Sequence, residues 1–184
     1  MDRRQRKTRE AIFSAFTELL AKKPFDRITV GEIIQQADVG RATFYAHFET
    51  KEFLLKELCQ ELFCHIFDAC CPDGEVHRHI FRCDAPESPF LHLLQHLANN
   101  DHHILDALSG KNQELFLGYF QAGVRQMVIR QLPLFAHRRS ERLPEDFWID
   151  HIASVFVQTV RWWLQNGMQV SAEIVTEYFF LAVS

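Results

Sequence analysis

Hydrophobic residues recur at helical spacing along nearly the whole chain, and this pattern restricts the possible folds most strongly. Phe13, Phe16 and Leu20 lie three or four positions apart, as expected for one face of a helix. No run of alternating β-branched residues indicates a strand. We therefore predict an all-α fold of about nine helices, because each periodic segment is bounded by its own start and stop signals.

Capping and turn residues divide the pattern into separate helices. The first helix is expected to end before Pro24, and Thr29 with Glu32 has the form of a capping box that begins the second. Asp38 to Gly40 predicts a tight turn, and Thr50 is suited to cap a long fourth helix. The other helices are expected at residues 41–48, 90–99, 101–109, 112–132, 144–166 and from 172 to the C-terminus.

The positive charge is concentrated at the beginning of the chain. Residues 1–52 contain 10 Lys and Arg against 8 Asp and Glu, whereas residues 53–184 contain 10 against 16. Five of the positive residues lie between Arg3 and Arg9. A basic segment on an otherwise acidic chain suggests a polyanionic partner at that end, although a solubilising tail has the same composition.

The segment 28–51 has the pattern of two short helices joined by a turn at Gly40. We expect Phe44 and Phe48 to enter a small core, together with Ile33, Ile34, Ala37 and Val39. The outward residues would then be Arg41, Ala42, Thr43, Tyr45 and His47. A helix that presents such side chains fits the major groove of DNA, so the pattern predicts a helix-turn-helix.

These residues give the chain a specific resemblance to the TetR family of bacterial transcriptional regulators over about residues 5–60. The matching positions are Thr29, Gly40, Thr43, Phe44, Tyr45, His47, Phe48 and Lys51. The resemblance implies a homodimer with a DNA-binding domain at 1–50 and a regulatory domain at 51–184. It also implies repression of neighbouring genes that a small molecule relieves.

The resemblance assigns phosphate contacts to Thr29 and Lys51 and places recognition-helix positions between Arg41 and His47. A polar helix face without DNA contacts is the simpler alternative for the same residues. The complete set of DNA-binding candidates is Arg3, Lys7, Thr29, Val30, Arg41, Ala42, Thr43, Tyr45, His47 and Lys51. The expected partner is double-stranded operator DNA with an inverted repeat.

Residues 53–184 contain 12 of the 17 phenylalanines and all three tryptophans. Such residues can line an apolar ligand pocket, although aromatic stripes at helical spacing also form ordinary cores. Our candidates for the pocket are Phe63, Phe67, Phe116, Tyr119, Phe120 and Met127. The last two helices carry more apolar surface than one chain needs, which predicts a dimer interface at Phe147, Ile152, Phe156, Val160, Trp163, Ile174 and Tyr178.

Alternative functions have weaker support in the sequence. Cysteines and histidines cluster between residues 70 and 83 and could bind metal or sense oxidants, but their spacing fits an incidental loop better. These residues are Cys70, Cys71, His77, His79 and Cys83. A co-regulator that acts through a protein partner is another alternative. Scattered histidines such as His92 and His96 have no catalytic pattern around them, so we expect no enzyme and no cofactor.

No apolar run reaches the ~18 residues that a membrane-spanning helix needs, and the charged start does not resemble a signal peptide. We therefore expect a cytoplasmic protein without a membrane partner.

Overall fold

The computed structural model describes residues 3–69, 88–99, 113–138, 140 and 142–183, and all its described regular elements are helical. The all-α prediction is therefore confirmed for this part of the chain. The expected helix at 101–109 and the cysteine and histidine cluster at 70–83 lie outside the described residues.

The described residues fall into two compact units. The first contains residues 3–62 and 113–119, and the second contains residues 63–69, 88–99 and 120–183. The division passes through helix α4 (Lys51–Ala69) and helix α7 (Gln113–Arg130). The domain boundary that we expect at residue 50 thus does not coincide with the division between the compact units, and it stays a prediction.

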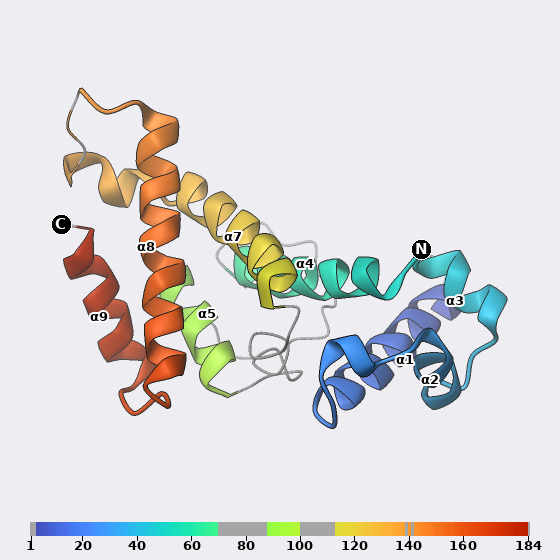
Figure 1. Ribbon diagram of the computed structural model, residues 1–184. Coiled ribbons are helices and arrows are strands. Elements are labelled where there is room, and N and C mark those ends of the chain that lie inside the picture. Colours follow the sequence, from blue (N-terminus) through green and yellow to red (C-terminus); the bar gives the residue numbers. More distant parts are fainter. Residues whose placement is uncertain (1–2, 70–87, 100–112, 139, 141, 184) are drawn as a thin grey trace. The chain divides into compact units, whose positions relative to one another are not determined.

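The first unit begins with α1 (Arg3–Leu20), a short 3-10 helix η1 (Phe25–Arg27), α2 (Val30–Gln36) and α3 (Arg41–His47) (Figure 1). Aromatic rings fill its core. Phe13 contacts Phe48 edge to face with ring centroids 5.4 Å apart, and Phe48 lies 5.9 Å from Phe44. All three rings are at most 2% exposed. This cluster joins the first helix to the third.

The second unit contains α5 (Pro89–Ala98), the 3-10 helix η3 (Leu132–Arg138), α8 (Glu145–Gln165) and α9 (Ala172–Ala182). Helix α9 packs against both α5 and α8, as the ribbon also shows (Figure 1). Phe90 lies at the centre of this packing, with ring centroids 5.4 Å from Phe156 and 4.9 Å from Phe179. The three rings are fully buried.

The capping signals predicted from the sequence are present. The Thr50 hydroxyl accepts a hydrogen bond from the Phe53 amide at 3.0 Å, and the Ser171 hydroxyl accepts one from the Ile174 amide. Gly167, the predicted end of α8, has a φ of +67°, which favours glycine. In the turn before α3, by contrast, the positive φ of 51° belongs to Asp38, and Gly40 has an extended φ of −73°. Aspartate tolerates this left-handed conformation because its side chain can hydrogen-bond locally.

We predict that Gly123→Ala destabilises the protein by about 1–3 kcal/mol, because overpacking a buried contact has this cost. A Cβ atom at Gly123 would overlap the ring of Phe63, which is only 4% exposed. Gly118→Ala on the same helix is the control, since a Cβ there meets nothing within 4 Å and alanine favours helix. Urea unfolding should show a lower free energy of unfolding for Gly123→Ala and a higher one for Gly118→Ala than for the wild type. Stabilisation by Gly123→Ala equal to that by Gly118→Ala would contradict the close packing.

Candidate nucleic-acid interface

A capping box fixes the start of α2. The Thr29 hydroxyl accepts a hydrogen bond from the Glu32 amide, and the Glu32 carboxylate accepts one from the Thr29 amide at 2.9 Å. A hydrogen bond from Lys23, together with those from Thr29, lowers the pKa of Glu32 to about 2. The charged form of the cap is therefore favoured. Its contribution to stability is complete above pH 4.5 and is lost as the pH falls toward 2.

Helix α3 has only seven residues, and its orientation follows from the buried Phe44 within it and the buried Phe48 at its C-cap. With Phe44 and Phe48 in the core, the side chains of Arg41, Thr43 and Tyr45 are exposed to solvent. Ala42 is exposed as well, and His47 is partly buried. The predicted division of this helix into a core face and an outward face is confirmed, with His47 at its border.

Lys51 at the start of α4 supports the preceding loop. Its ammonium group donates to the carbonyl oxygens of Phe25 at 3.0 Å and Ile28 at 2.9 Å, with a longer contact to Asp26 at 3.4 Å. It also lies 4.6 Å from the centre of the Phe25 ring. These contacts give Lys51 a structural role that the sequence does not indicate, and its phosphate contact stays a prediction.

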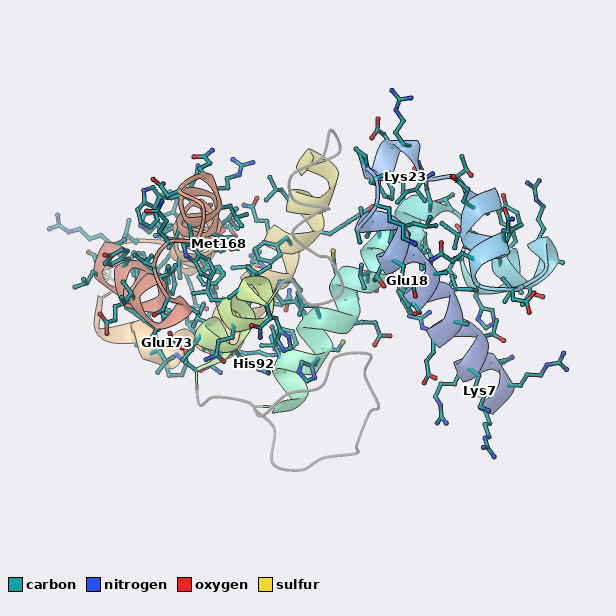
Figure 2. All side chains as sticks on the ribbon, turned by 90° about the horizontal axis from the view of Figure 1, so that it is seen from below. Lys7, Glu18, Lys23, His92, Met168 and Glu173 are labelled. Atoms are coloured by element: carbon teal, nitrogen blue, oxygen red, sulfur yellow. The ribbon has the colours of Figure 1, made fainter. Side chains whose placement is uncertain are left out.

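The basic N-terminal segment is part of α1, and its cations have two different environments. The Arg9 guanidinium pairs with Glu57 at 2.6 Å and with Glu61 at 3.3 Å, and it stacks near the rings of Phe13 and Phe48. Arg9 therefore joins α1 to α4. Arg3 and Lys7 are exposed, and Figure 2 shows the Lys7 side chain projecting away from the helix.

The candidate DNA contacts thus come from four helices of the first unit: α1, the start of α2, α3 and the start of α4. Thr29 is exposed at the start of α2, while Val30, its first residue, is partly buried. Arg41, Thr43 and Tyr45 project from α3. An exposed short helix that follows a capped helix and a tight turn is the arrangement that helix-turn-helix proteins insert into the major groove.

Three of the aromatic residues predicted to line a ligand pocket, Phe63, Phe67 and Phe120, contact one another, and their role in ligand binding stays a prediction. Phe63 lies 5.6 Å from Phe120 and 6.3 Å from Phe67, between ring centroids. Met127 is fully buried, Tyr119 is partly buried, and the Phe116 side chain lies outside the described part. A cleft of about 620 Å³ lies elsewhere, between α5 and the turn that joins α8 to α9. Its lining includes His92, His96, Gln95, Asn99, Trp163 and Glu173.

The dimer-interface prediction needs a correction on α8. Four of its residues are at most 1% exposed within the single chain: Ile152, Phe156, Val160 and Trp163. They form the subunit's own core and are not available to a partner. Phe147, Ile174 and Tyr178 are 57%, 39% and 45% exposed, and Trp162 and Leu181 on the same two helices are 44% and 71% exposed. Successive helical residues lie about 100° apart, so Trp162 and Trp163 point in different directions, and here Trp163 is buried while Trp162 is exposed.

Comparison with known proteins identifies this architecture. The family model described as "Bacterial regulatory proteins, tetR family" matches residues 12–58, and one described as "Transcriptional regulator C-terminal region" matches residues 84–183. A crystal structure of a TetR transcriptional regulator from Streptococcus agalactiae 2603V is 34% identical, with a TM-score of 0.74. That match covers 100% of this chain and 97% of the other.

Other similar proteins agree with this result. A putative TetR-family regulator from Syntrophomonas wolfei str. Goettingen has the same fold, with a TM-score of 0.67 at 16% identity over 97% of this chain and 93% of that one. In Bacillus subtilis (strain 168), the HTH-type transcriptional regulators YxbF and YvdT are 38% and 29% identical over 78 and 68 residues. The matches span 40% and 37% of this chain, but only 20% and 34% of those relatives' lengths.

Fold and site together define a helix-turn-helix transcriptional regulator. The chain belongs to the TetR family of bacterial regulators, as its resemblance in residues 5–60 predicts. Proteins of this family are DNA-binding transcription factors, which agrees with the expectation of a regulator and not an enzyme.

None of the helices in the described ranges combines the length and the apolar character that crossing a membrane requires.

We predict that Lys51→Ala lowers the free energy of unfolding by about 1–3 kcal/mol, because the loop carbonyls lose a charged donor. Lys56→Ala is the matched control. Lys56 is exposed on the same helix, and surface substitutions of this kind usually change stability by less than about 0.5 kcal/mol. Urea unfolding of both variants decides the question, and equal stabilities would show that the Lys51 contacts are dispensable.

Proposed function

We propose that this protein is a repressor that binds an inverted-repeat operator as a homodimer and is released from it by a small molecule. The observation that carries the proposal is the exposed face of α3, held outward by the burial of Phe44 and Phe48. The family places the chain among transcriptional regulators. The sign of regulation, the effector and the contacts below are our inferences, as is a cytoplasmic location.

The exposed side chains divide into two groups by their expected contacts. Arg41 can donate to guanine N7 and O6, and Thr43 and Tyr45 can meet thymine methyl groups or base edges. Arg3, Lys7 and Thr29 flank this helix and are suited to phosphate or the adjacent minor groove. Val30, Ala42, His47 and Lys51 are the remaining candidates in the interface. The first group would set sequence preference, and the second would supply affinity for any DNA.

An apolar face on α8 and α9 supports the homodimer. Trp162 and Tyr178 lie against each other, with ring centroids 5.9 Å apart, and both are nearly half exposed. They line a groove whose other walls include Val155, Thr159 and Ala182. Apolar side chains on two adjacent helices suit a two-fold four-helix contact with a second copy, because the same surface can then cover itself.

Release by an effector requires that the small molecule bind the two conformations of the protein with different affinities. The cleft beside α5 has the volume typical of small-molecule sites, and apolar and polar side chains both line it. A tenfold loss of operator affinity needs about 1.4 kcal/mol of coupling between the effector and DNA sites.

We predict that Tyr45→Ala costs about 1–3 kcal/mol on the operator and little on random DNA, because Tyr45 would contact bases. Lys7→Ala should weaken binding to all DNA sequences alike and reduce the slope of log affinity against log salt concentration by about 1. Selection of bound sequences from a random pool, repeated with each variant, provides the measurement. The absence of an inverted repeat, or a changed preference with Lys7→Ala alone, would contradict the assigned roles.

A second prediction concerns the dimer. Trp162→Glu combined with Leu181→Glu should yield monomers of unchanged helicity, because the charges would be desolvated in the interface. Leu134→Glu is the control, since Leu134 is 48% exposed in η3, outside the two interface helices. Sedimentation and circular dichroism should separate these outcomes. A double variant that remains a dimer of unchanged affinity would rule out this interface.

A further inference from the structure

Three histidines from two helices meet inside the second unit. His65 comes from α4, and His92 and His96 come from α5. They are 9%, 1% and 2% exposed, and one ring nitrogen from each lies within 4.8 Å of the others. The ring centroids are between 4.8 and 5.1 Å apart. Burying an imidazole costs free energy unless a partner compensates for its lost hydration. Three buried imidazoles close together therefore indicate a shared interaction.

The spacing of the nitrogens is close to that of metal ligands. His92 and His96 lie four positions apart on one helix face, and their Nε2 atoms are 3.1 Å apart. Two nitrogens bound to a tetrahedral zinc ion at 2.0–2.1 Å are separated by about 3.3 Å. The pair on α5 therefore needs little movement to hold an ion, and His65 adds a third nitrogen from the neighbouring helix.

The protonation state of His92 also suits metal binding. Burial, together with the neighbouring His96 and His65, lowers the pKa of His92 to about 4. His92 is thus neutral at physiological pH, and neutral imidazole is the form that coordinates metals.

The cluster borders the cleft described above, because His92 and His96 both line it. The opposite walls of the cleft come from the turn that contains Met168 and from the start of α9 at Glu173; Figure 2 labels these residues together with His92. Glu173 is hydrogen-bonded to Gln95 at 3.2 Å on that side. The cleft offers an entry path for an ion and room for a fourth ligand, such as water or a small molecule.

We propose that His65, His92 and His96 form a binding site for one divalent transition-metal ion of the zinc type, with its fourth coordination position open to the cleft. Three imidazoles favour zinc and related ions over magnesium and calcium, which prefer oxygen ligands. The proposed site differs from the cysteine and histidine cluster at 70–83, which would supply thiolate ligands. It does not depend on the proposed DNA contacts.

Untagged full-length protein, stripped of metal with a chelator, should bind one Zn²⁺ per chain in competition with a chromophoric chelator. We expect His96→Gln and His65→Gln each to weaken binding by at least about 100-fold, since even supporting residues of metal sites can cost that much. His151→Gln is the control, because His151 is exposed on α8. Circular dichroism verifies that each variant is folded.

A second measurement uses wild-type protein and so does not depend on variant folding. Co²⁺ should produce the visible absorption of a tetrahedral site with nitrogen ligands and without the near-ultraviolet charge-transfer bands of cobalt thiolates. A variant with Cys70, Cys71 and Cys83 replaced by serine should bind Zn²⁺ as the wild type does. Absence of zinc binding by the wild-type chain, thiolate bands, or loss of binding in the serine variant would overturn the proposal.

Discussion

The burial of Phe44 and Phe48 beside Phe13 is the interaction on which the DNA-binding unit depends. A helix of seven residues such as α3 is not stable alone, because nucleation costs more than so few hydrogen bonds return. Packing of Phe44 against Phe48, and of Phe48 against Phe13 of α1, therefore supports the helix. The same packing determines that Arg41, Thr43 and Tyr45 are exposed. The formation of α3 and the exposure of these three side chains therefore depend on the same packing.

The charged residues around this core have separate functions. Arg9 and Lys51 are directed inward, where Arg9 pairs with carboxylates of α4 and Lys51 binds loop carbonyls. Arg9 thus links α1 to α4, and Lys51 links the start of α4 to the segment before α2. Arg3 and Lys7 extend into solvent from the beginning of α1. A basic segment that looks uniform in sequence thus contains cations for structure and cations available to a polyanion.

The second unit contains two kinds of core. Around Phe90, aromatic rings pack at distances typical of favourable ring contacts and need no polar partner. Around His92, three imidazoles are buried as well, and a buried polar group needs a partner to offset its lost hydration. Polar groups kept in such positions commonly have a binding function. The exposed face of α9 differs again, because Tyr178 and Leu181 are apolar residues in contact with solvent.

The sequence by itself determined the helical class, the capping box at Thr29, the ends of α5, α8 and α9 to within about two residues, and the family. These features depend on neighbours within one or two turns of the chain, and local spacing reports them directly. Only the tertiary structure decided which apolar face of α8 is buried, because Trp162 and Trp163 are equally hydrophobic and only packing distinguishes them. Likewise, it brought His65 to within coordination distance of His92 and His96, since residues this far apart in sequence meet through packing alone.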